Sequence, residues 1–150
     1  IRFGNGHWVG YQSEKLISGK MVPVCSQAFL RLHGHIDTPE QLLQMPLLHD
    51  EERTTWNQWF VQQGVKRPPR STGPLFEDGL LTLAGVQAGL GCALMREPLI
   101  APYLKSGELV KIFDAAIDDG RDYYLCVRQD SDMTPNGKLL QSWLRQQALG

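Results

Sequence analysis

Seven short apolar segments, separated by turn residues and helical patterns, constrain the fold of this chain more than any other feature. Most of them are continuous apolar runs rather than alternating ones, which is typical of strands covered on both faces. Because strands and helices alternate along the chain, the sequence predicts an α/β fold. The predicted strands span residues 1–3, 20–25, 46–49, 74–76, 92–95, 109–113 and 123–128.

Helices between these strands are marked by their first residues. Pro39 and Pro135 each follow a threonine, so both segments offer an N-cap residue and a proline at the first helical position. A helix is also expected to begin at Glu97. The segment after Asp78 is apolar nearly all round, which predicts a helix lying between a sheet and other protein.

Charge and hydropathy exclude two classes of function for this segment. The 150 residues carry 15 Lys+Arg and 16 Asp+Glu, a net charge of -1. The one basic run, Lys66–Arg70, contains two prolines and is predicted to be a loop, so direct DNA binding by this segment is not expected. No apolar stretch approaches the roughly 20 residues that span a bilayer, so no membrane partner is expected.

The three cysteines predict the compartment in which the protein works. Cys25, Cys92 and Cys126 each lie in an apolar, strand-like run, without the spacing of a metal site or a disulfide framework. We expect buried free thiols in a reducing cytoplasm. The sequence begins at Ile1 without an initiator methionine or a signal peptide, which we interpret as a C-terminal fragment of a longer protein.

Catalytic and metal-binding patterns are weak. The glycine run Gly4–Gly10 lacks the spacing of a phosphate-binding loop, and the sequence has no nucleophile elbow or paired-cysteine motif. His33 and His35, with His49, could supply metal ligands, but a polar surface loop explains the first two better. We therefore predict no enzyme activity, no cofactor and no metal.

Acidic residues follow two predicted strands, and each position has two interpretations. The acids after His49, which include Asp50 and Glu52, are expected in a loop and the first helical turn, where they interact favourably with the helix dipole. Asp78 is expected to cap the next helix. Ligands also bind at the carboxyl ends of strands in open α/β sheets and at helix N-termini, so binding roles stay open at both places.

Several sequence blocks, in this order, carry a family resemblance. Phe76–Leu80, Ala84–Met95 and Leu104–Val110 resemble the C-terminal co-inducer-binding domain of LysR-type transcriptional regulators. The opening Ile1–Trp8 and the segment Pro23–Ser26 resemble the branch that contains activators of glycine cleavage and of β-lactamase induction. The resemblance covers essentially the whole chain.

This resemblance implies a periplasmic-binding-protein-like fold of two Rossmann-like lobes joined by two crossing strands. Residues 1–25 and 122–150 would form part of the first lobe, and residues 26–121 the second lobe. The winged helix-turn-helix and the rest of the first lobe would lie upstream, absent from this chain.

The resemblance also implies a small-molecule effector bound between the lobes. In the β-lactamase-inducer branch the position at or next to Asp78 tends to hold a small hydroxyl residue, so an Asp here favours an amine or a cation. Tyr123 and Tyr124 point to opposite faces of a strand, so only one can reach the effector, and we favour Tyr124. The expected effector-binding residues are Gly6, Trp8, His49, Phe76, Asp78 and Tyr124.

The implied partners are those of a bacterial regulator. They are an amino acid, peptide-like or amine effector, DNA through the absent N-terminal domain, and RNA polymerase indirectly. A homodimer or homotetramer is expected in the cytoplasm. The alternatives are a periplasmic-type solute-binding protein, a small α/β enzyme, and an architectural domain that has lost ligand binding.

Overall fold

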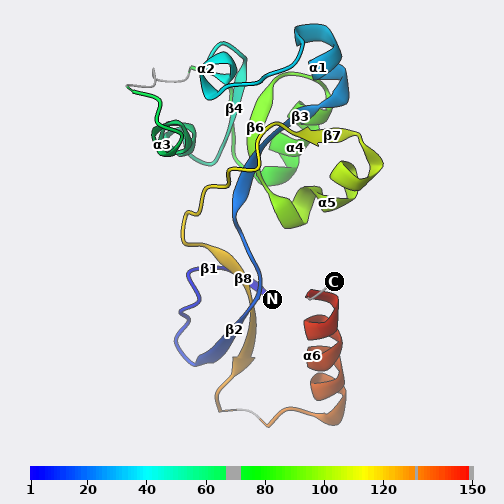
Figure 1. Ribbon diagram of the computed structural model, residues 1–150. Coiled ribbons are helices and arrows are strands. Elements are labelled where there is room, and N and C mark those ends of the chain that lie inside the picture. Colours follow the sequence, from blue (N-terminus) through cyan, green and yellow to red (C-terminus); the bar gives the residue numbers. More distant parts are fainter. Residues whose placement is uncertain (67–71, 131, 149–150) are drawn as a thin grey trace. The chain divides into compact units, whose positions relative to one another are not determined.

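The computed structural model describes residues 1–66, 72–130 and 132–148 (Figure 1). The chain divides into two compact units, unit 1 with residues 1–20 and 118–150, and unit 2 with residues 21–117. The lobe boundaries expected from the sequence lie a few residues C-terminal to these divisions. Most of the basic run at 66–70 lies outside the described residues.

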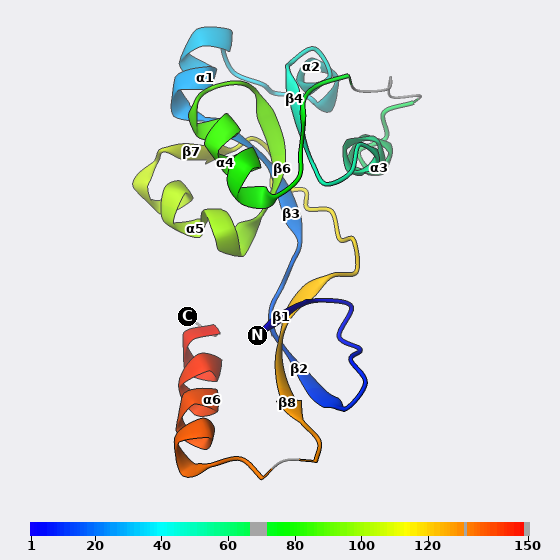
Figure 2. The ribbon, with the colours of Figure 1, turned by 180° about the vertical axis from the view of Figure 1, so that it is seen from behind.

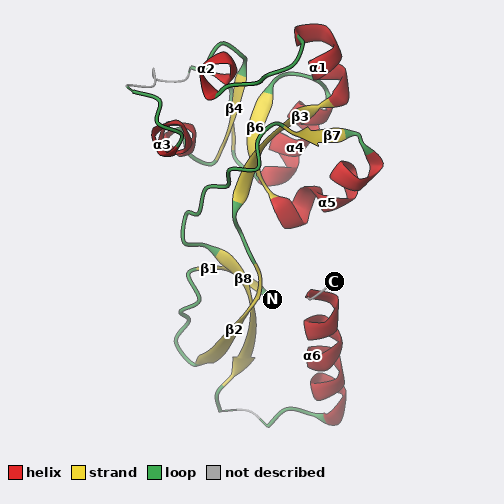
Figure 3. Ribbon diagram, viewed as in Figure 1, coloured by secondary structure: helices red, strands yellow, loops and turns green. Residues whose placement is uncertain are grey.

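Unit 2 is built on a five-stranded sheet with helices on both faces (Figure 3). The strand order is β5-β4-β6-β3-β7, with β4 parallel to β5 and β6, and β3 antiparallel to β6 and β7. The strands are β3 (Met21–Ser26), β4 (Leu47–Asp50), β5 (Leu75–Phe76), β6 (Cys92–Arg96) and β7 (Leu109–Lys111). The helices are α1 (Gln27–His33), α2 (Pro39–Leu42), α3 (Thr54–Gln62), α4 (Gly79–Gln87) and α5 (Glu97–Ser106).

Two cores lie on opposite faces of this sheet. Every residue of β3 and β6 is buried, as their continuous apolar runs predict. Cys25, with its neighbours on that face, packs against α1, α2 and the aromatic side chains of α3. Val24 faces the other way, toward α4 and α5. Figure 2 shows α4 on its face of the sheet. The α/β fold class is therefore confirmed for unit 2.

Capping hydrogen bonds confirm three of the four predicted helix starts, and α5 begins at Glu97 as predicted but has no side-chain cap. Thr38 caps α2 in a reciprocal capping box with Gln41. The Asp78 carboxylate caps α4 by accepting from the first backbone N–H groups of the helix. The Thr134 hydroxyl accepts from the N–H of Gly137, 3.2 Å away, at the start of the last helix. A side-chain acceptor at each position satisfies backbone donors that have no partner within the helix.

Unit 1 is a three-stranded antiparallel sheet with one helix. The strands are β1 (Arg2–Gly4), β2 (Tyr11–Ile17) and β8 (Asp122–Arg128), in the order β1-β8-β2, and the helix is α6 (Pro135–Ala148). The strand β2 was not predicted, because its first five residues hold only one large apolar side chain, Tyr11, and no continuous apolar run. Within the described residues, no helix is long and apolar enough to cross a membrane.

Other predictions need correction. His33 does not lie in a loop; it ends α1, where its ring stacks on Phe29. The acids after His49 do not enter a helical turn, since α3 begins only at Thr54 and Glu51 has a left-handed backbone with φ 57°. Their carboxylates therefore do not lie within the helix whose dipole they were expected to stabilise.

The thiols follow the prediction at two positions of three. Cys25 and Cys92 are buried and free, whereas Cys126 is only half-buried. The outer face of α4 also differs from the expectation of a covered helix, because Leu80 and Leu81 are exposed in this chain.

The sheet of unit 1 contains an ion pair between a largely buried carboxylate, Asp122, and a half-exposed lysine, Lys15. The Asp122 carboxylate lies 2.6 Å from Nζ of Lys15 and accepts from the N–H of Gly19 at 2.7 Å. The hydrogen bond from Lys15, and then that from Gly19, hold the pKa of Asp122 below its usual range. The same pair raises the pKa of Lys15.

We therefore expect Asp122→Asn to lower stability near neutral pH. The contribution of Asp122 is present above its unfolded pKa of about 3.9 and is lost as the pH falls through its lower folded pKa. Urea denaturation from pH 7 to pH 2.5 should show the unfolding midpoints of the wild type and of Asp122→Asn converging in acid. The exposed Asp130→Asn is the control, and a wild-type advantage that stays constant into strong acid would contradict this assignment.

Candidate functional site

Three of the predicted site residues come together in unit 1. Gly6 has φ 87°, and a Cβ at this position would lie 2.8 Å from two ring carbons of Tyr124. The Trp8 ring packs edge-on against Tyr124 with 5.6 Å between ring centroids. The phenol of Tyr124 therefore lies close over Gly6, a contact that requires a residue without a side chain.

An arginine that sequence reasoning missed joins this cluster. Arg2 is paired with Tyr124 across the β1–β8 ladder, so both side chains project from the same face. Its guanidinium carbon lies 4.1 Å from the ring centroid of Tyr11 and 5.7 Å from that of Trp8, distances at which a cation is attracted to an aromatic face. Beside these rings is a hollow of about 490 Å³, lined by Gly6, His7, Trp8, Val9, Tyr11 and Ser13.

The choice between the two adjacent tyrosines has a structural basis. Tyr123 packs against Phe3, with ring centroids 4.9 Å apart, whereas Tyr124 packs against Trp8. Adjacent residues of a strand point to opposite faces. Only Tyr124 therefore belongs to the cluster with Gly6 and Trp8.

The other three predicted site residues lie at one edge of the sheet in unit 2. Asp50 pairs with Phe76 where the parallel strands β4 and β5 end, and Asp78 follows two residues later. The Phe76 ring packs against α4, since a Cβ on Gly85 would lie 3.3 Å from its Cζ. The carboxyl ends of parallel strands are where open α/β sheets bind ligands.

His49 is the most enclosed of the predicted residues. It is 1 % exposed and lies beside Asp50, Thr55 and Trp56 around a cavity of only about 10 Å³. Burial, followed by the positive charge of Arg53, lowers the pKa of His49, so its imidazole is neutral at physiological pH. His49 therefore supports the sheet edge from within the core and is not itself exposed there.

Two carboxylates flank the first turn of α4. Oδ1 of Asp78 accepts from two backbone N–H groups of the helix, at 2.8 and 2.9 Å. The Thr82 hydroxyl lies 3.3 Å from Oδ1 of Asp50 and 3.1 Å from the carbonyl oxygen of Asp78. Because Asp78 already occupies these N–H groups, they do not offer a binding place for an anion. The arrangement favours a cationic or hydrogen-bond-donating group instead.

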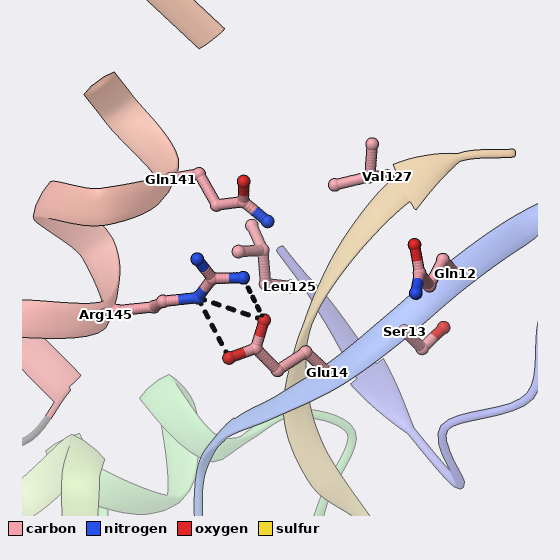
Figure 4. Close-up of a pocket in the computed structure, with 7 residues that line it drawn as sticks. All are labelled: Gln12, Ser13, Glu14, Leu125, Val127, Gln141 and Arg145. Atoms are coloured by element: carbon pink, nitrogen blue, oxygen red, sulfur yellow. Dashed lines mark hydrogen bonds and ion pairs between the residues drawn. The ribbon is translucent and has the colours of Figure 1, made fainter. Parts of the chain in front are cut away.

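Unit 1 also contains a groove between α6 and the sheet, which the sequence did not predict (Figure 4). Its volume is about 240 Å³, and Arg145 reaches across it to Glu14 with hydrogen bonds of 2.9 and 2.6 Å. The bond from Arg145 lowers the pKa of Glu14. The two residues are far apart in sequence, so no local pattern could have shown this pair. The lining residues are Gln12, Ser13, Glu14, Leu125, Val127, Gln141 and Arg145.

Among the described residues, no group of three or more His, Cys, Asp or Glu side chains is arranged to hold a metal ion. The structure thus assembles the six predicted residues into two sets. Gly6, Trp8 and Tyr124 form the first set, in unit 1. His49, Phe76 and Asp78 form the second set, in unit 2.

Comparison with curated proteins gives named relatives. The activator AmpR of Rhodobacter capsulatus is 31% identical over 148 residues, which are 99% of this chain and 50% of that protein. The glycine cleavage system transcriptional activator of Escherichia coli (strain K12) is 31% identical over 125 residues, 83% of this chain and 41% of that protein. The chain spans about half the length of these relatives or less. Because both are transcriptional activators, the comparison favours a regulator over a solute-binding protein.

Solved structures and a family model agree with these relatives. The AmpR effector-binding domain of Citrobacter freundii matches with a TM-score of 0.83 and 28% identity, over 99% of this chain and 72% of that one. The effector domain of AmpR from Pseudomonas aeruginosa matches with a TM-score of 0.79 and 25% identity, over 99% of this chain and 70% of that one. The model of the LysR substrate binding domain matches residues 1–149. The chain therefore belongs to the LysR substrate-binding domain family and has its periplasmic-binding-protein-like fold.

Proposed function

We propose that this chain binds a small-molecule effector for a LysR-type transcriptional regulator and transmits that binding to a DNA-binding domain. The observation that carries the proposal is the family match over residues 1–149. The hollow lined by Gly6, Trp8 and Tyr11, with Tyr124 packed against Gly6 and Trp8, supports it, because convergent aromatic and polar groups beside a concave surface are typical of small-molecule sites. In this proposal the chain has no catalytic role.

The proposed division of the chain follows the lobes of the family. Residues 1–25 and 122–150 would belong to the first lobe and residues 26–121 to the second. Exposed apolar side chains in unit 1 support this division, because a complete first lobe would contain further polypeptide to cover them. None of the described α6 residues is buried, and Leu139, Leu140 and Trp143 are each more than half exposed. The matched effector-domain structures are also longer than this chain.

The proposed effector carries an amine or another cationic group. The Asp50 and Asp78 carboxylates at the start of α4 support this, since a helix N-terminus that accepts an anion normally leaves its N–H groups free. Here Asp78 occupies two of them. An amino acid, a short peptide or a simple amine would all supply the cation.

The proposed mechanism is a shift between two conformations. An effector that contacts both lobes favours one arrangement only through its higher affinity for that arrangement. In a cytoplasmic homodimer or homotetramer, this difference would change the spacing of the DNA-binding domains and thereby act on RNA polymerase. By linkage, DNA in the favoured geometry would raise effector affinity by the same factor.

Asp78→Asn tests the role of the charge separately from the role of the cap. Asparagine is as good an N-cap as aspartate, so we expect stability to change by only a few tenths of a kcal/mol. Effector affinity should fall at least about tenfold, because the carboxylate charge is lost. Asp78→Ala should lose affinity and also about 1 kcal/mol of stability.

The measurement is calorimetric titration of the full-length regulator with its effector. Asp114→Asn, at a fully exposed carboxylate in unit 2, is the matched control and should bind normally. An unchanged affinity in Asp78→Asn would remove the cationic group from the proposal. The sensor function would then be tested only by whether the wild-type regulator binds an effector at all.

A further inference from the structure

Two cysteines face each other across the central strands of unit 2. The antiparallel register pairs Val24 with Ala93, which makes Cys25 and Cys92 the next opposed pair. The Cys92 N–H donates to the carbonyl oxygen of Pro46, 2.9 Å away, on the side opposite β3. Cys25 and Cys92 are therefore a non-hydrogen-bonded pair, the kind in which Cα atoms approach to about 4.5 Å and side chains are closest.

Both thiols point to the same face of the sheet. They belong to one core cluster with the aromatic side chains of α3, and each is 0 % exposed. A Cα separation of about 4.5 Å falls inside the range of disulfides, roughly 4.4–6.8 Å. An S–S bond would therefore need rotation of two side chains but no separation of the strands.

The two thiols interact with each other. A hydrogen bond from the Cys92 thiol lowers the pKa of Cys25, while this bond and burial raise the pKa of Cys92. This hydrogen bond agrees with the opposed positions of the two thiols on β3 and β6. Cys126, in unit 1, lies near the Ser13 hydroxyl at 3.6 Å, on a different sheet, and offers an internal comparison.

We propose that Cys25 and Cys92 form a covalent modification site, which a hydroperoxide oxidises to a disulfide that ties β3 to β6. One of the two sulfurs attacks a peroxide oxygen, the O–O bond breaks, and the products are a sulfenic acid on that cysteine and one water. The other sulfur then attacks the sulfenic sulfur, the S–S bond forms, and the hydroxyl departs as a second water. The two thiols lose two electrons and two protons, and hydrogen peroxide is reduced to two waters.

This site shares no residue with the proposed effector site, because Cys25 and Cys92 lie on β3 and β6 and none of the six proposed effector-binding residues does. Its bond would close a loop of the chain from residue 25 to residue 92 and would restrict the unfolded state. Since both sulfurs are fully buried, alkylation of either should be slower than alkylation of the half-buried Cys126, and oxidation should require transient opening of the sheet.

Peptide mapping of the full-length protein tests the proposal directly. The reduced protein is treated with hydrogen peroxide, its remaining thiols are blocked with N-ethylmaleimide, and it is digested with trypsin without reductant. The three cysteines then fall in separate peptides, 21–31, 71–96 and 122–128. The expected product is peptide 21–31 linked to peptide 71–96, which disappears on reduction. Recovery of both as blocked thiols or as separate sulfinic acids would overturn the proposal.

Variants add a second measurement. Oxidation should raise the Tm of Cys126→Ser by at least about 5 °C, as in the wild type, because the Cys25–Cys92 bond still forms. Cys92→Ala should show no such rise. A rise that persists in Cys92→Ala would assign the effect to another thiol and contradict the proposal. If Cys92→Ala does not fold, the peptide map of the wild type decides alone.

Discussion

Trp59→Ala is expected to destabilise unit 2 by about 3–5 kcal/mol. Trp59 is fully buried on α3, where its ring packs edge-on against Trp56 and Phe60. Its indole Nε1 donates a hydrogen bond of 2.8 Å to the carbonyl oxygen of Ala115. Alanine leaves a cavity among the aromatic rings and removes the donor from that carbonyl.

Urea denaturation should show this loss as a lower midpoint with an unchanged slope. Val61→Ala is the control on the same helix, because Val61 is 61 % exposed and its loss should change stability by less than about 0.5 kcal/mol. Equal midpoints for Trp59→Ala and Val61→Ala would contradict the placement of α3 against the sheet.

Gly91→Ala is expected to lower the free energy of unfolding by about 3 kcal/mol, which is in the upper part of the usual range for overpacking. A Cβ at Gly91 would lie 2.3 Å from the carbonyl oxygen of Pro46 and 3.0 Å from its carbonyl carbon. These are backbone atoms at the point where β4 and β6 begin to pair, so they cannot move without disturbing the ladder. The displacement would reach the strand that carries His49 and Asp50.

Gly107→Ala separates this steric effect from the ordinary cost of replacing a glycine. Gly107 has φ 78°, but a Cβ at this position would meet no heavy atom within 4 Å, so only backbone strain of about 1–2 kcal/mol is expected. Thermal or urea denaturation of the two variants makes the comparison. If Gly91→Ala loses no more stability than Gly107→Ala, the result would contradict the close approach of β4 and β6 at Pro46.

The fold of unit 2 was predictable because its signals are local. The apolar runs of β3 and β6 are long enough to be recognised without knowing their partners, and Asp78 marks the start of α4 by its own chemistry. The strand β2 gave no such signal. It is held by antiparallel pairing with β8, and its polar side chains face solvent or make specific bonds, as Glu14 does.

The site could be predicted only in part, because its contacts join distant segments. Family resemblance pointed to Gly6 and Tyr124, but their close approach follows from a fold that brings the first loop onto β8. Arg2 was missed because a single arginine in a short strand has no sequence pattern that indicates aromatic partners. The pairing of Cys25 with Cys92 likewise depends on strand register, which composition does not reveal.

A thermal-shift screen of the full-length regulator tests the central claim most directly. The panel would hold amino acids, short peptides, amines, and organic and aromatic acids. A bound effector at about 100 times its Kd adds about 2.7 kcal/mol to native stability, which corresponds to a Tm rise of roughly 5–10 °C. The account predicts such a rise with an amine-bearing compound, and its loss in Asp78→Ala. A panel in which no compound raises the Tm would contradict an effector-binding role for this chain.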